Sequence, residues 1–239
     1  MHRLFALQGL AGFCLSYLTV YHAEQFLVSG LVALGYAGAP LANLVLARVV
    51  MGTPMSRRVA AGGLLGLAGI ALIFLQELLR VRMGSELLLG AALTMGGVLM
   101  SGIAGLAATR YHQQSVHGWG PLAWAMGYGG LATSVIALAT GRSFAVAWSP
   151  TFAGSLAFLV VGGAIVAFGA YFAVMRRVGL ARASYVGVMS TVIAIVLSSV
   201  AEGFHWTVWT VVGVALALAG NVLAMAPQPA PQSTPKRPT

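Results

Sequence analysis

Residues 31–74 read LVALGYAGAPLANLVLARVVMGTPMSRRVAAGGLLGLAGIALIF, and residues 182–225 read RASYVGVMSTVIAIVLSSVAEGFHWTVWTVVGVALALAGNVLAM. Aligned with a constant offset of 151, the two stretches share ten of 44 positions. Composition alone would give about four or five identities in a chain so rich in Ala, Leu, Gly and Val. The aligned identities include Gly62 with Gly213 and Gly69 with Gly220. The alignment therefore suggests an internal repeat whose glycines form helix-packing faces.

The composition places the chain in a membrane. It is 59% hydrophobic and only 7% charged, with a mean hydropathy of +0.90, whereas soluble domains carry about 25% charged residues. Apolar runs of about 20 residues are long enough to cross a bilayer as helices. We therefore predict an all-α integral membrane protein with about eight transmembrane helices, near residues 4–21, 26–48, 58–79, 86–108, 119–140, 152–175, 179–201 and 206–226.

The basic residues predict the orientation of these helices, because Lys and Arg are retained on the cytoplasmic side. With the N-terminus inside, ten of the 13 basic residues fall in the cytoplasm and only Arg80, Arg82 and Arg142 fall outside. This arrangement accounts for the net charge of +9 without any nucleic-acid partner. We expect a multi-pass protein of the cell (inner, cytoplasmic) membrane with both termini cytoplasmic, and residues 227–239 as a proline-rich, disordered cytoplasmic tail.

The same orientation inverts the repeat. The helix near 26–48 runs from outside to inside, and its counterpart near 179–201 runs from inside to outside. Inverted repeats around a midplane site are typical of secondary transporters. We expect residues 1–79 to hold the last three helices of a first five-helix repeat and residues 84–226 to hold a complete second repeat. The counterparts of the helices near 86–108 and 119–140 would precede Met1, so the start of the gene is misplaced, the chain is trimmed, or the protein has eight helices.

Small and polar residues follow one face of the helix near 26–48, at spacings of three and four. Ser29, Tyr36, Pro40 and Asn43 lie on this face, and a similar stripe in the helix near 179–201 includes Thr191. Such a face either lines a polar path or allows helices to pack closely, and Tyr36 and Asn43 are large for a packing groove. The residues predicted to contact a substrate are Tyr17, Ser29, Tyr36, Asn43, Ser101, Tyr128, Tyr171, Tyr185, Ser190 and Thr191.

The acidic residues argue against a carboxylate-coupled pump. The chain has no Asp, and its four Glu residues, at positions 24, 77, 86 and 202, all lie near predicted external helix ends. A proton or sodium carrier would be expected to hold a carboxylate in the membrane, so facilitated or externally coupled transport is favoured. Glu24 with His22 and Glu202 with His205 form either a pH-sensitive gate or solvated interfacial pairs.

The sequence shows no sign of an enzyme. It contains no GxSG or HExxH motif, and its single cysteine, Cys14, cannot form an intrachain disulfide. A catalytic site would need a nucleophile with a base, or a metal-ligand set, facing one cavity. We therefore expect no catalytic residues, no metal and no cofactor.

Three strings resemble the EamA-type branch of the drug/metabolite transporter superfamily. They are YHAEQFLVSGLVAL at 21–34, LAFLVVGGAIVAFGAYFAVMRRVGLARASYVGV at 156–188 and SSVAEGFHWTVWTVVGVALALAGNVLAM at 198–225. The resemblance implies ten helices in two inverted repeats around a central cavity, the first two being absent here. It also implies export or exchange of amino acids or other small metabolites. The matching positions are Glu24, Ser29, Gly30, Arg182, Tyr185, Glu202, Gly203, Trp206 and Asn221, whereas Thr53 and Thr191 depart from the family pattern.

These observations predict a permease that exports small organic metabolites, such as amino acids, by alternating access. The expected partners are the lipid bilayer and a small-molecule solute, with a homodimer or a partner chain also possible. The alternative is a truncated, transport-incompetent scaffold or subunit that needs a partner chain. The residues expected to act as gates or structural motifs are Glu24, Pro40, Arg182, Glu202, Gly203 and Asn221.

Overall fold

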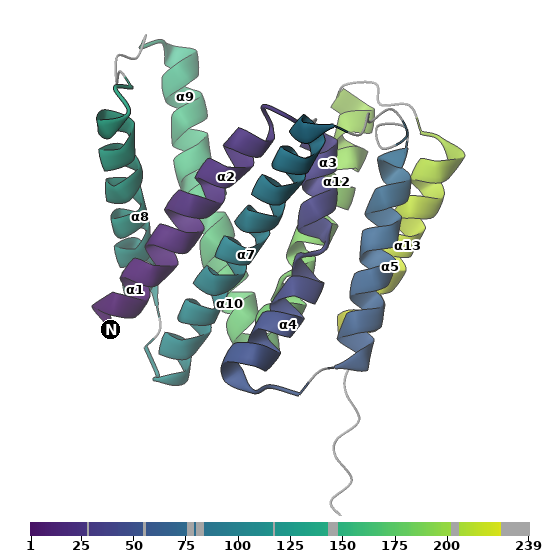
Figure 1. Ribbon diagram of the computed structural model, residues 1–239, viewed down its shortest axis with the longest axis horizontal. Helices are drawn as coiled ribbons and strands as arrows, with labels where there is room; N and C mark the ends of the chain where they lie inside the picture. Colours follow the sequence, from purple (N-terminus) through teal and green to yellow (C-terminus); the bar gives the residue numbers. More distant parts are fainter. Residues whose placement is uncertain are drawn as a thin grey trace, which may run out of the picture.

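The structure is a computed structural model that describes residues 1–27, 29–54, 56–75, 79, 84–116, 118–142, 148–201 and 206–225, without the side chains of residues 29 and 194–201. The described residues form helices joined by short connections and contain no strand, which confirms the predicted all-α fold. Figure 1 shows the helices side by side, most of them running between the same two ends of the molecule.

The elements follow the predicted order. The chain begins with α1 (His2–Gln8), the π-helical segment η1 (Gly9–Leu15) and α2 (Ser16–Ala23), which form one continuous helix. It continues with α3 (Ser29–Ala37), α4 (Ala39–Met51), α5 (Arg57–Ile73), α7 (Ser85–Gln113) and α8 (Trp119–Ala139). The last part comprises α9 (Pro150–Phe158), the π-helical segment η2 (Leu159–Val166), α10 (Ala167–Val178), α11 (Leu180–Ala183), α12 (Tyr185–Ala201) and α13 (Val208–Met225).

Six helices in the described part of the chain are long and apolar enough to cross a membrane. The other two predicted spans correspond to α5 and to α11 with α12, which are shorter. One difference from the predicted limits is in α7, which ends at Gln113 instead of residue 108. Its extra turn carries Arg110 and His112, whose long polar side chains can reach water from the end of a membrane helix.

Local chemistry explains several helix ends. Ser56 and Ser149 cap α5 and α9, because their hydroxyl oxygens accept hydrogen bonds from the backbone N–H groups of Val59 (3.4 Å) and Phe152 (3.1 Å). Gly52 ends α4 in the left-handed conformation, with φ of 67°. α3 and α4 are separated at Gly38, and Pro40 lies in the first turn of α4, where it needs no N–H partner.

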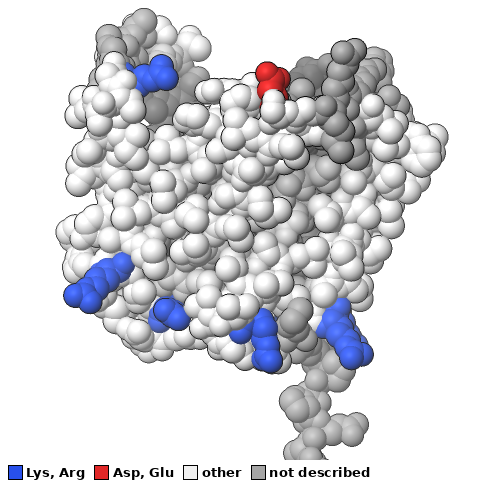
Figure 2. Space-filling view, viewed as in Figure 1, with Lys and Arg blue, Asp and Glu red and all other residues white. Residues whose placement is uncertain are grey.

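The charges are unevenly distributed between the two ends of the bundle. Figure 2 shows most Lys and Arg side chains at one end, the end where α1 begins and where α4 and α10 finish. An acidic side chain lies at the opposite end. This distribution is the one that the positive-inside rule gives when the basic end faces the cytoplasm.

The offset of 151 also relates elements of the structure. Adding 151 to η1 gives residues 160–166, which coincide with η2, and adding it to Arg57, where α5 begins, gives Val208, where α13 begins. Since π-helical segments are rare, two of them at equivalent positions support the alignment of the repeats.

α5 and α13 pack closely against each other through equivalent glycines. A Cβ atom on Gly69 would lie 2.5 Å from the carbonyl oxygen of Gly213, and one on Gly62 would lie 2.5 Å from that of Gly220. The offset exchanges these two contacts, because it carries Gly62 to Gly213 and Gly69 to Gly220. Reciprocal contacts of this kind are the signature of a twofold axis, so a pseudo-twofold passes between α5 and α13.

Candidate functional site

A cavity of about 490 Å³ lies among α3, α4, α7, α10 and α12. This volume falls in the range of small-molecule sites. The lining combines aromatic rings with hydroxyl and amide groups, and it consists of Glu24, Val32, Ala33, Tyr36, Ala37, Ala39, Asn43, Ser101, Phe168, Tyr171, Ser184, Val186, Gly187, Ser190 and Thr191. We call it the central cavity.

The structure brings together six of the ten residues predicted to contact a substrate: Tyr36, Asn43, Ser101, Tyr171, Ser190 and Thr191. Tyr17 lies in an adjoining cavity of about 350 Å³, which shares Tyr36, Ser101 and Phe168 with the central one. Glu24, predicted as a gate, also lines the central cavity and is exposed. Whether the six residues bind a solute stays a prediction, but separate helices bring them to one space.

Two predicted residues lie elsewhere. Tyr128 shares a hydrogen bond of 3.1 Å with Nδ1 of His2 and stacks on Trp124, away from the central cavity. Tyr185 is fully buried, and its hydroxyl donates to the carbonyl oxygen of Val59 at 2.6 Å. Sequence spacing predicts which residues share a helix face, but the neighbouring helices decide which space that face meets. Tyr185 thus connects α12 to α5.

The remaining motif residues have varied surroundings. Asn221 on α13 donates through Nδ2 to the backbone oxygen of Tyr185 at 3.3 Å, which joins α13 to α12. Arg182 is half-buried on α11, and Pro40 is buried in α4. The side chain of Ser29, together with Glu202 and Gly203, lies outside the described residues.

A buried polar network crosses the cavity wall between α4 and α11. Asn43, only 4% exposed, donates through Nδ2 to Oγ of Ser184, and that hydroxyl donates to the backbone oxygen of Leu180 at 2.9 Å. Oδ1 of Asn43 is buried and has no hydrogen-bond partner. Ser184, absent from the predicted contact residues, was detectable only as a member of the polar stripe in its helix.

The other polar groups of the central cavity also make internal hydrogen bonds. The Tyr36 hydroxyl is 3.1 Å from Oγ of Ser16, which in turn donates to the backbone oxygen of Gly97 at 3.1 Å. The hydroxyls of Ser190 and Thr191 both donate to the backbone oxygen of Gly187, at 2.9 and 3.1 Å. These bonds fix the orientation of the side chains that face the cavity.

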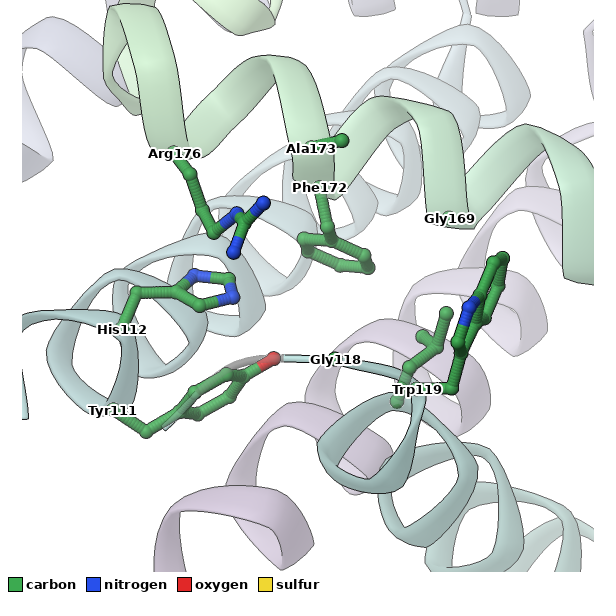
Figure 3. A pocket seen from close by; sticks show the side chains of 9 residues that line it. Tyr111, His112, Gly118, Trp119, Gly169, Phe172, Ala173 and Arg176 are labelled. Carbon is green, nitrogen blue, oxygen red and sulfur yellow. The ribbon is translucent and has the colours of Figure 1, made fainter. Parts of the chain in front are cut away.

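A second, smaller pocket of about 160 Å³ lies between α7, α8 and α10 and is basic (Figure 3). Arg176 and His112 converge on it from different helices, and the Trp119 ring lies on its other side. Gly169 makes room for that ring, because a Cβ at this position would collide with it. Phe168 and Tyr171 of α10 face the central cavity, whereas Gly169 and Arg176 face this pocket.

The comparisons with known proteins agree with this geometry. Residues 88–226, more than half of the chain, match the model of the EamA-like transporter family. The chain belongs to this family. Its members are transporters of the drug/metabolite type, so the chain is a multi-pass protein of a lipid bilayer with a small-molecule solute. No curated protein matches the sequence.

A protein of known crystal structure shares the fold with a TM-score of 0.76 at 16% sequence identity. The similarity covers 93% of this chain and 75% of that protein. At this level of identity the structural match supports only the arrangement of the helices. The family match is what identifies this chain as a membrane transporter.

Proposed function

We propose that this protein is a permease that moves small organic metabolites, such as amino acids, through the central cavity by alternating access. One observation carries the proposal: the cavity is lined by equivalent residues of both repeats. The offset of 151 relates Ala33 to Ser184, Tyr36 to Gly187 and Ala39 to Ser190, and all six residues line the cavity.

A site on a pseudo-twofold axis suits alternating access. Rocking of one repeat against the other exchanges the two sides of such a site while the site itself stays in place. The close glycine contacts between α5 and α13 favour a rigid pivot beside the cavity. Under this proposal α4 and α12 move relative to each other, and Glu24 lies at the external opening.

Solute efflux from proteoliposomes tests the proposal, with release of the common amino acids followed by mass spectrometry. Asn43→Leu should lower the initial rate at least tenfold, because it removes a buried polar group of the cavity, and Tyr36→Phe should lower it less. Tyr128→Phe is the matched control, since Tyr128 lies outside the cavity. Equal efflux by all variants at equal membrane content would contradict the proposal.

The basic end of the bundle is proposed to face the cytoplasm, with both termini there and the protein in the cell membrane. A C-terminal fusion to a reporter that is active only outside the membrane should stay silent, whereas the same reporter inserted after Arg142 should be active. A signal from the C-terminal fusion would reverse the orientation.

The alternative function is a membrane subunit that needs a partner chain. The observation that favours it is the exposure of the helix formed by α9, η2 and α10, in which only 6% of the most apolar stretch is buried. Purified chain reconstituted alone separates the two functions. Efflux without any partner would reject the subunit, and efflux restored only by a second membrane protein would reject the independent permease.

A further inference from the structure

Several polar groups of the central cavity present acceptors to a solute, because they use their own protons in hydrogen bonds inside the protein. Asn43 shows this most clearly. Ser184 gives its only hydroxyl proton to Leu180, so it can only accept from Asn43, and Asn43 must face it with Nδ2. The carbonyl oxygen Oδ1 is therefore the end left without a partner.

An unpartnered buried acceptor is costly unless something donates to it. Oδ1 of Asn43 lies against Gly102 of α7, where a Cβ would come within 2.5 Å of it. Glycine at this position keeps a side chain off the acceptor. The adjacent residue Ser101 lines the cavity, and the buried acceptor lies behind the cavity wall.

Three hydroxyl groups of the lining, on Tyr36, Ser190 and Thr191, follow the same rule. Ser16 gives its proton to Gly97, so the Tyr36 hydroxyl must donate to Ser16 and keeps only its lone pairs for the cavity. Ser190 and Thr191 give their protons to the backbone oxygen of Gly187. Each of these three oxygens can accept a hydrogen bond from a solute without breaking an internal one.

The charges and rings of the cavity favour the same kind of solute. Among the described lining residues there is no Lys, Arg or His, and the one ionisable acid is Glu24. The rings of Tyr36, Phe168 and Tyr171 offer faces that attract a cation. A carboxylate or phosphate group entering this space would lose its water and gain few donors and no counter-charge.

We infer that the central cavity selects organic amines, and that the three N–H groups of the solute's ammonium donate to Tyr36, Ser190 and Thr191. The inference rests on the proposed transport function and ranks its substrates: solutes with a positively charged amino group and no free carboxylate should be carried best. Amino acids should be carried less well than the amines that lack their carboxylate.

Fractionated metabolites test this inference for the whole class of solutes at once. A cell extract is separated at neutral pH into cation-exchanger-bound, anion-exchanger-bound and unbound fractions, and each is loaded into proteoliposomes holding the full chain. The chain should release solutes from the cation-bound fraction at least tenfold faster than empty liposomes do. Release confined to the other two fractions would overturn the inference while leaving the transport function intact. No release from any fraction would instead overturn the transport function.

A matched pair of variants tests the assigned acceptors. Thr191→Val removes an acceptor from the cavity with little change in shape, and Thr109→Val removes a hydroxyl that makes the same bond, to Gly105, on a face of α7 outside the cavity. Tyramine should inhibit the efflux of the cation-bound solutes. Thr191→Val should weaken this inhibition by tyramine several-fold, and Thr109→Val should not change it. Hydroxyphenylpropionate, which replaces the amine by a carboxylate, should inhibit neither. Stronger inhibition by the carboxylate than by tyramine, or equal effects of the two variants, would contradict the assignment.

Discussion

The offset of 151 relates the helix formed by α1, η1 and α2 to the helix formed by α9, η2 and α10, but their surroundings differ. A third of the most apolar stretch is buried in the first helix, compared with 6% in the second. α7 and α8 cover the first helix: a Cβ on Gly9 would collide with the backbone oxygen of Ala125. Near the equivalent position, a Cβ on Gly162 or Gly163 would meet only side chains of their own helix.

The comparison shows which features the two helices share and which depend on the helices packed against them. The π-helical segment is present in both copies, so contact with α7 and α8 does not cause it. Close approach of backbones occurs only in the covered copy. The exposed helix formed by α9, η2 and α10 could therefore pack against another helix in the way that the first helix packs against α7 and α8. Its surface is apolar enough to face either lipid or another helix.

The largest expected effect tests the covered copy. Gly9→Val places a branched side chain against the backbone of α8, which cannot yield as a flexible side chain can, and should lower the free energy of unfolding by about 3 kcal/mol or more. Gly162→Val, in the exposed copy, should change it by less than about 0.5 kcal/mol. The measurement is the midpoint of thermal unfolding in detergent, followed by size-exclusion chromatography. Similar losses for both variants would mean that η2 is covered in solution.

The second prediction concerns the glycine contacts between α5 and α13, where residues related by the offset have the same surroundings. Gly69→Ala and Gly220→Ala occupy equivalent positions and should each cost about 1–3 kcal/mol, because each Cβ would meet backbone of the facing helix. Gly66→Ala is the control, since its Cβ would make an ordinary contact of 3.7 Å with Val188. A large difference between the two equivalent variants would argue against the pseudo-twofold axis.

Much of the fold could be predicted because each helix is a separate apolar run with a length set by the bilayer. Six cavity residues, among them Tyr36, Asn43 and Thr191, could be predicted because helical spacing places polar groups on one stripe. The hydrogen bond between Asn43 and Ser184 could not, since it joins residues 141 positions apart. That Tyr128 and Tyr185 lie outside the central cavity could not be predicted for the same reason, as only the packing shows which space an aromatic ring meets. The π-helical segments carry no sequence signal that we recognise.

The third prediction separates a buried tyrosine that supports the fold from one that faces the cavity. Tyr185→Phe removes the hydrogen bond to Val59 and should cost about 1 kcal/mol of stability with little change in the rate of efflux. Tyr36→Phe removes the hydrogen bond to Ser16 and should also lower the rate of efflux, because Tyr36 is partly exposed to the cavity. Paired measurements of thermal unfolding and efflux check both. A loss of efflux in Tyr185→Phe at full stability would move this residue into the solute path.

The smallest effect on stability, and the most direct test of the exposed copy, comes from a probe at residue 165. The offset relates Cys14, which is 1% exposed, to Ile165, which is 43% exposed. A nitroxide attached to Ile165→Cys in a Cys14→Ala background should collide freely with dissolved oxygen in the bilayer, because no described helix covers this position. Leu106, buried between helices, provides the low-accessibility reference when it is labelled as Leu106→Cys. Low oxygen accessibility at 165 in native membranes, with high accessibility after purification, would show that another membrane segment covers this helix in the cell, and the subunit function would then be favoured over the independent permease.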